Sequence, residues 1–211
     1  MKLSKSLIFN MLLIIGEISG LIWAQVTQGV SIKYYTNLSN IIALISGILF
    51  VISYYVNNKI LNNISSYFKF ISTIGLTVTF LVVIFVLSPQ MALTGGSYFT
   101  LVIPNGFIFL HIICPILEIV SFIFFENHTS FKKVRWYLLS CLYTFAYGIV
   151  ILNLVYFTNV EPPYFFLNAK EIGYFQTFGI GLLLVLFTLL IAFILVTLNN
   201  LVIKHNSKEI K

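Results

Sequence analysis

The feature that most constrains this chain is a succession of apolar stretches, each about 20 residues long, separated by short polar segments. An apolar helix of about 20 residues is long enough to cross the ~30 Å hydrocarbon core of a bilayer. Inside that core every backbone polar group must be bonded within the protein, which favours helices. The sequence therefore predicts an all-α, polytopic membrane protein with six transmembrane helices, at residues 7–27, 35–56, 67–87, 103–125, 136–157 and 175–203.

The composition supports the same class. Hydrophobic residues make up 59% of the chain and charged residues 9%, whereas about a quarter of the residues in a soluble domain are charged. The connections between the apolar stretches are too short to hold a soluble domain. We therefore expect residues 1–211 to form a single transmembrane domain, with any chemistry inside the membrane or at its surfaces.

The distribution of basic residues predicts the orientation. If both termini are cytoplasmic, the outer loops contain only Lys33 and Lys170. The inner segments then contain Lys2, Lys5, Lys59, Lys69, Lys132, Lys133, Arg135, Lys204, Lys208 and Lys211. Cytoplasmic loops retain Lys and Arg, so this asymmetry predicts an N-in, C-in topology. The net charge of +6 reflects that bias and suits anionic lipid headgroups, so nucleic acid is not an expected partner. The preference for Lys over Arg, with abundant Asn and Ile, indicates a bacterial plasma membrane.

The fourth apolar stretch contains His111, Pro115 and Glu118, three residues that a lipid-facing helix avoids. At about 100° per residue, His111 and Glu118 fall on one face of a helix, and we expect this face to point away from lipid. Pro115 has no N–H, so it is expected to leave the His111 carbonyl without its helical partner and to kink the helix. A histidine beside such a carbonyl at membrane depth indicates a functional site.

The first stretch carries Glu17 close to its centre, beside a ladder of small residues formed by Gly16, Gly20 and Ala24. Small residues at this spacing let another helix approach closely. A charged side chain at the bilayer centre costs about 3 kcal/mol. We therefore expect Glu17 to face the helix bundle, either neutral or paired, as part of a site or as a link between helices.

In the second stretch, Thr36, Asn40, Ala43 and Gly47 share one helical face. Thr and Asn near a helix start also serve as caps or as links between helices. With the N-terminus inside, the second and fourth helices both run from the outer to the inner side. Thr36 and His111 are then both in the outer half of the membrane, and we expect them to meet.

Three other regions are assigned roles. Tyr143 and Tyr147 lie one turn apart and are placed to hydrogen-bond a ligand, although buried tyrosines also bond neighbouring backbone. The apolar part of the third stretch has only Ser and Thr as polar residues and is expected to be scaffold. The uncharged outer loop at 89–106 is either a lid between the second and fourth helices or a plain interfacial loop.

Metal and cofactor chemistry is not expected. The chain lacks HExxH, CxxC, GxSxG, Walker A and GxGxxG motifs and contains no aspartate. His128 and His205 are expected on the cytoplasmic side, so His111 has no histidine partner. A zinc site of His111 with Glu17 and Glu118 is the one metal arrangement left open. Cys114 and Cys141 are expected to be small apolar fillers rather than a disulfide.

Three short motifs carry a resemblance to a known group: Tyr35-Thr36-x-x-Ser39-Asn40, His111-x-x-x-Pro115, and the run from Tyr143 to Gly148. The pattern resembles that of prokaryotic six-helix membrane proteins, a group remotely similar to the eukaryotic androgen-induced and androgen-dependent TFPI-regulating proteins. The eukaryotic members are intramembrane threonine hydrolases that cleave fatty acid esters of hydroxy fatty acids. In place of the aspartate that often follows the His-Pro pair in the prokaryotic group, this chain has Ser121, with Glu118 nearby.

The resemblance implies that Thr36 is a nucleophile and His111 its general base. A neutral imidazole within hydrogen-bond reach accepts the threonine proton as the hydroxyl attacks an ester carbonyl. Asn40 is placed to donate to the oxyanion, and Glu17 is the candidate to orient the imidazole. Glu17, Asn40, Glu118, Tyr143 and Tyr147 are expected to contact the substrate, a hydrophobic or acyl-ester molecule drawn from the membrane lipids.

Two other functions fit the same residues. A six-helix binding or transport subunit for a small hydrophobic metabolite also needs few charges and a pocket with convergent polar groups. Its basic inner loops would dock a cytoplasmic protein whose identity the sequence does not indicate. Alternatively, the chain is a small structural or lipid-organising protein in which Thr36 and His111 bond to each other.

Overall fold

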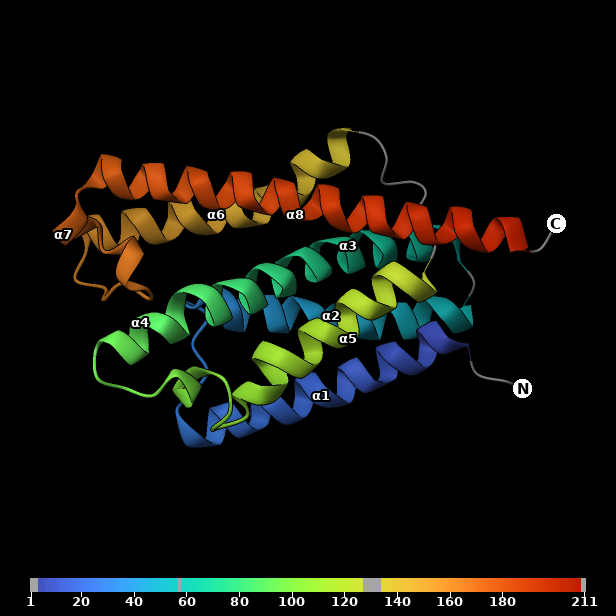
Figure 1. Cartoon of the computed structure of the whole chain (residues 1–211), viewed down its shortest axis with the longest axis horizontal. Helices are drawn as coiled ribbons and strands as arrows, with labels where there is room; N and C mark the ends of the chain where they lie inside the picture. Colours follow the sequence, from blue (N-terminus) through green and yellow to red (C-terminus); the bar gives the residue numbers. More distant parts are fainter. Residues whose placement is uncertain (1–3, 57, 127–133, 210–211) are drawn as a thin grey trace. The chain divides into compact units, whose positions relative to one another are not determined.

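The computed structural model describes residues 4–56, 58–126 and 134–209, and this part of the chain is helical with no strand (Figure 1). Within these residues, five helices are long and apolar enough to cross a membrane: α1 (Lys5–Thr27), α2 (Tyr35–Val56), α3 (Lys59–Val82) with its continuation to Leu93, α6 (Val134–Phe157) and α8 (Tyr174–Glu209). The fourth predicted span is a shorter apolar helix, Phe109–Phe125. The structure thus supports a membrane protein with transmembrane helices, and six crossings stay a prediction.

The fourth span is built around two π-helical turns. Its central part, α5 (Cys114–Val120), lies between η3 (Phe109–Ile113) and η4 (Ser121–Phe125). In η3 the N–H of Cys114 bonds to the Phe109 carbonyl, five residues back. A wider turn thus precedes Pro115, and such π-bulges are frequent at functional sites.

The remaining elements are short and connect the long helices. η1 (Val83–Leu87) and α4 (Ser88–Leu93) extend α3, and η2 (Tyr98–Leu101) lies in the loop that leads to η3. η6 (Phe165–Leu167) and α7 (Ala169–Ile172) lie between α6 and α8. The loop at 89–106 therefore has helical turns of its own.

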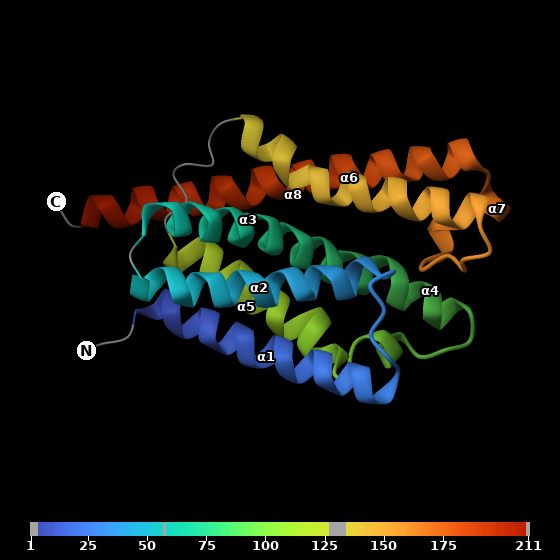
Figure 2. The ribbon, with the colours of Figure 1, turned by 180° about the vertical axis from the view of Figure 1, so that it is seen from behind.

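The chain divides into two compact units, one formed by residues 1–129 and 195–211 and the other by residues 130–194. In the first unit, α1, α2, α3 and α5 lie side by side, as Figures 1 and 2 both show. The start of α1 and the last turns of α8 lie at the same end of this unit.

Glycines let α1 approach α5 closely. A Cβ atom on Gly16 would lie 2.7 Å from Cys114 Sγ, and one on Gly20 would lie 2.6 Å from Leu110 Cδ2. The pairing of Gly20 with Leu110 and of Gly16 with Cys114 shows that the two helices are antiparallel. The prediction that this small-residue ladder receives another helix is confirmed, and the partner is the helix that carries His111.

A small apolar cluster lies where the four helices meet. It contains Leu13, Ala43, Leu76 and Cys114, one residue from each helix, with Phe109 packed against it. All four cluster residues are buried. Because Ala43 and Cys114 share this cluster, it fixes the relative depth of α2 and α5.

The second unit has a core of its own. Ile151, Leu152 and Val155 of α6 pack with Leu167 and Ala169 from the connection to α8. Tyr147 is partly buried and packs against this core.

The start of the third span differs from the prediction. α3 begins at Lys59, where Asn58 caps it by accepting hydrogen bonds from the N–H groups of Ile60 and Leu61. Lys69 therefore lies within the helix, about 15 Å from its first residue at 1.5 Å per residue. Its side chain is fully buried, so counting Lys69 among the basic residues of the inner segments was wrong, although the predicted span at 67–87 already contained it.

Candidate functional site

Lys69 is the centre of a buried polar network in the first unit. Its ammonium group donates to Asn10 Oδ1 at 2.9 Å and to Glu118 Oε2, and lies 3.4 Å from Glu126 Oε1. An ammonium group has three N–H donors, and these contacts provide an acceptor for each. A buried charge needs such pairing, because removing it from water without partners is very unfavourable.

The Glu118 carboxyl group also accepts hydrogen bonds from two hydroxyl groups of α3. Ser72 donates to Glu118 Oε1 at 2.5 Å and Thr73 donates to the same oxygen at 3.3 Å, while Oε2 faces Lys69. Ser72 and Thr73 follow Lys69 by three and four residues, so all three side chains share one face of α3. The interior position expected for Glu118 is confirmed, and this carboxyl group is paired.

Glu126 closes the network at the end of η4. Its Oε1 accepts from Ser121 Oγ at 2.6 Å and from Asn10 Nδ2 at 3.1 Å. The carbonyls of this last turn are satisfied by α8, because Asn199 Nδ2 donates to the carbonyls of Phe122 at 2.7 Å and of Glu126 at 2.8 Å. Both the side chain and the backbone at this helix end are thereby fixed.

Sequence reasoning missed most of this network. Lys69 was counted with the inner basic residues, so nine of the ten remain as candidates for the positive-inside bias. Glu126, Asn10 and Asn199 were given no role. The available signal was the spacing of Lys69, Ser72 and Thr73 in an otherwise apolar run, which marks a polar helix face.

Glu17 lies in the interior, as expected, but is not part of the hydrogen-bonded network. It is fully buried, and neither of its carboxyl oxygens forms a hydrogen bond with a described residue. The Cys114 thiol, at most a weak donor, lies beside it, and Glu118 is near enough for two ionised carboxylates to repel each other. Glu17 therefore extends the polar region about 10 Å along α1 from Asn10.

His111 forms a separate polar region on the other side of the apolar cluster. Its Nδ1 lies 2.6 Å from the Leu101 carbonyl oxygen, and its ring stacks on Phe107 at a centroid distance of 4.9 Å. A carbonyl only accepts hydrogen bonds, so Nδ1 carries the hydrogen and Nε2 keeps the lone pair of a base. The imidazole is thus oriented by loop 89–106. The expectation that Glu17 orients it was wrong, because Glu17 lies one turn further in, beside Cys114.

Thr36 and Asn40 lie on the helix that passes this region. Both are buried, and α2 contacts the π-helical turn that carries His111. Asn40 and His111 each precede a member of the apolar cluster by three residues, which places them at about the same depth. Thr36 precedes Asn40 by one turn, so it lies about 6 Å nearer the start of α2.

Only some of the polar atoms in this region have a hydrogen-bond partner. Asn40 Nδ2 donates to the Thr36 carbonyl at 2.7 Å, whereas Asn40 Oδ1 is buried without a hydrogen bond among the described residues. Within the part of the chain that the structure describes, His111 forms no hydrogen bond to Thr36. A water-mediated approach between the two stays a prediction.

Comparison with known proteins gives no assignment. No protein-family model, curated protein or solved structure matches this chain. The function must therefore be argued from the sites themselves. Within the described residues, no group of three or more His, Cys, Asp or Glu side chains is arranged to hold a metal ion.

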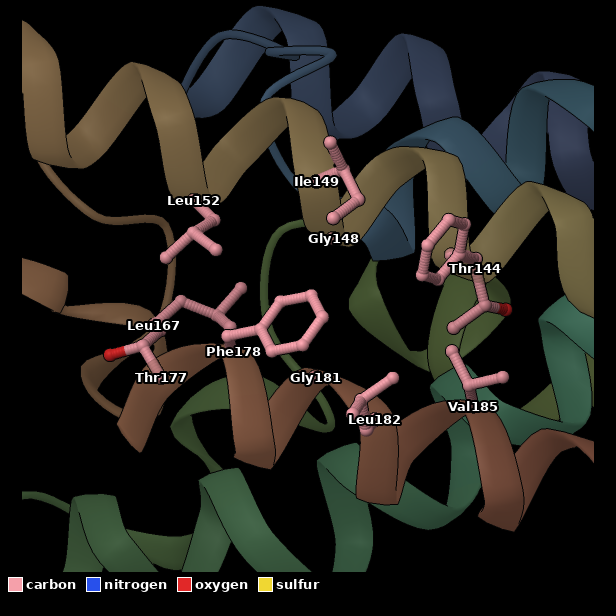
Figure 3. A pocket seen from close by; sticks show the side chains of 11 residues that line it. Thr144, Gly148, Ile149, Leu152, Leu167, Thr177, Phe178, Gly181, Leu182 and Val185 are labelled. Atoms are coloured by element: carbon pink, nitrogen blue, oxygen red, sulfur yellow. The ribbon is translucent and has the colours of Figure 1, made fainter. Parts of the chain in front are cut away.

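The second unit contains Tyr143 and Tyr147, both on α6. It also contains a pocket with about 330 Å³ of empty space, part of it open to the surroundings, between α6 and α8. Figure 3 shows Thr144 and Gly148 on one side of this pocket and Phe178 and Gly181 on the other. Neither tyrosine is among the residues that line it.

Proposed function

We propose that this chain is a six-span protein of the bacterial plasma membrane, with both termini in the cytoplasm, that hydrolyses lipid or fatty-acyl esters. Thr36 is the nucleophile and His111 the general base. The observation that carries the proposal is the hydrogen bond from His111 Nδ1–H to the Leu101 carbonyl. It fixes the ring and leaves Nε2 as the proton acceptor, the state a general base requires. The motif resemblance to threonine hydrolases supports the choice of Thr36.

The reaction follows from these roles. An acyl chain enters from the lipid of the outer half, and its ester carbonyl reaches the Thr36 hydroxyl. His111 Nε2 takes the hydroxyl proton as the oxygen attacks, and then returns it to the leaving alcohol. The amide of Asn40 stabilises the oxyanion. Water, activated by the same nitrogen, then releases the fatty acid from Thr36. Loop 89–106 acts as the lid, since its Leu101 holds the imidazole.

A kinetic experiment tests the proposal. The protein in lipid nanodiscs is given a fluorogenic long-chain acyl ester, and the Thr36→Ala, His111→Ala and double variants are compared. Because a nucleophile and its base act as one unit, all three should lose similar activity, without additivity. The matched control is Ser39→Ala, which removes a neighbouring buried hydroxyl of α2 and should retain activity. Losses that multiply in the double variant, or an equal loss in Ser39→Ala, would contradict the proposal.

The pocket of the second unit supports a second candidate, a binding subunit for a small hydrophobic metabolite. Its lining is mostly apolar, with Thr144 and Thr177 as the polar side chains, which is the composition typical of small-molecule sites. A photoreactive fatty alcohol should crosslink to α6 or α8, and Gly181→Leu should abolish this by filling the pocket. Gly179→Leu is the matched control, since Gly179 lies on the same helix outside the pocket lining. Equal crosslinking in both variants would exclude this pocket as the binding site.

A further inference from the structure

The buried ionisable groups of the first unit do not balance in charge. Two carboxyl groups, those of Glu118 and Glu126, contact the one ammonium group, that of Lys69, and a third, that of Glu17, lies close to Glu118. All four side chains are buried, and Glu126 is the most accessible of them at 9%. A cluster with two uncompensated negative charges is very unfavourable in a low-dielectric interior. At least one carboxyl group must therefore take up a positive ion.

The hydrogen bonds identify which carboxyl group that is. Glu118 faces Lys69 and accepts from Ser72 and Thr73, and Glu126 accepts from Ser121 and Asn10. Such donors stabilise the ionised form of these two groups. Glu17 has no comparable donor among the described residues.

The surroundings of Glu17 point the same way. The ionisable side chains beside it come from α5, namely Cys114 and Glu118. The charge of Lys69 on α3 is already shared by Glu118 and Glu126. α2 has no Asp, Glu, Lys, Arg or His residue. An ionised Glu17 would thus face another carboxylate with no cation of its own.

We propose that Glu17 is an exchangeable proton-binding site, loaded through the Lys69, Glu118 and Glu126 network. The ligand is a proton and not a metal cation, because a metal ion needs several oxygen ligands. Among the described residues, the ionisable groups beside Glu17 are the Glu118 carboxyl group, which is already engaged, and the Cys114 thiol. This site is distinct from His111 and Thr36 and does not depend on ester hydrolysis.

The fold also indicates the route of the proton. Towards Asn10 and Glu126 the polar side chains continue to the end of η4, where Glu126 is the least buried member. On α1 Leu13 lies one turn from Glu17 towards Asn10, so the step from Glu17 to the network runs through its neighbour Glu118, whereas no hydrogen bond among the described residues links Glu17 to His111. The proton therefore reaches Glu17 from the Glu126 end, which is the cytoplasmic side in the proposed topology.

Infrared spectroscopy tests this inference directly. The chain has six acidic residues, all of them glutamate, so a protonated carboxyl band is easy to assign. The full-length protein in nanodiscs near neutral pH should show the carbonyl stretch of a protonated carboxyl group. This band should move to lower frequency in D2O, be absent in Glu17→Gln and be shifted in Glu17→Asp. It should be unchanged in Glu171→Gln, which alters an exposed glutamate of α7.

Each other outcome overturns the inference. A wild-type spectrum without the band shows that no carboxyl group holds a proton, whatever the variants do. A band that persists in Glu17→Gln, or that is lost only in Glu118→Gln, places the proton elsewhere. A band that does not move in D2O shows that the proton does not exchange. The hydrolase assay has no bearing on these spectra, so the two proposals can fail independently.

Discussion

Lys69 of α3 donates a hydrogen bond to Glu118 of α5, and both side chains are completely buried. The two residues are 49 positions apart in sequence, so the pair ties the third span to the fourth. Asn10 brings α1 into the same contact set, since it bonds to both Lys69 and Glu126. The first unit thus has a polar centre that fixes the relative positions of three helices.

The contributions of Lys69 and Glu118 to the free energy of unfolding should depend strongly on each other. Lys69→Met leaves Glu118 and Glu126 without their cation, and breaking a buried ion pair from one side costs about 3–5 kcal/mol. The double variant Lys69→Met/Glu118→Gln removes one charge of each sign and should be less destabilised than the sum of the single variants. Unfolding by titration with dodecyl sulfate measures this difference. Additive single effects would show that the two groups do not interact.

The close approach of α1 to α5 should be sensitive to added volume at Gly20. An alanine Cβ there would overlap Leu110, which is fully buried and cannot move aside easily. We expect Gly20→Ala to lower the free energy of unfolding by about 1–3 kcal/mol, the usual effect of overpacking. Gly148→Ala is the control, because nothing lies within 4 Å of that position. Equal stability of the two variants would mean that the helices are not in close contact at Gly20.

The proposed topology predicts opposite labelling at the two ends of the helices. In a background with Cys114→Ala and Cys141→Ala, a cysteine at Lys59 should react with a membrane-impermeant maleimide only after the cells are permeabilised. A cysteine at the exposed residue Val160 should react in intact cells. The reverse pattern would invert the protein and place His111 in the inner half of the membrane.

The helices were largely predictable because apolar length alone sets them. The predicted range of the second span coincides with α2, and that of the fifth begins two residues after α6 does. The fourth span was harder to place. Its π-helical turns and its beginning at Phe109 depend on packing against α1 and on Pro115, which an apolar pattern does not report.

The candidate sites were only partly predictable. Glu17 and Glu118 could be identified as interior because an acid in an apolar run must avoid lipid. Lys69 was harder to identify, because its spacing with Ser72 and Thr73 was the available signal and a lysine near a membrane surface also extends its side chain to water. Its partner Asn10 is 59 positions away, and no local pattern links the two. The backbone carbonyl of Leu101 as the partner of His111 likewise follows from the loop's path and not from any residue type.

The most direct test of the central claim is the site of covalent modification. The protein in nanodiscs is treated with a long-chain fluorophosphonate, which reacts irreversibly with activated hydroxyl nucleophiles, and the adduct is located by mass spectrometry. We predict modification of Thr36 that disappears in His111→Gln and remains in Ser39→Ala, because activation depends on the basic nitrogen of His111. The absence of any adduct on Thr36, or an adduct on Thr36 that persists in His111→Gln, would contradict the account.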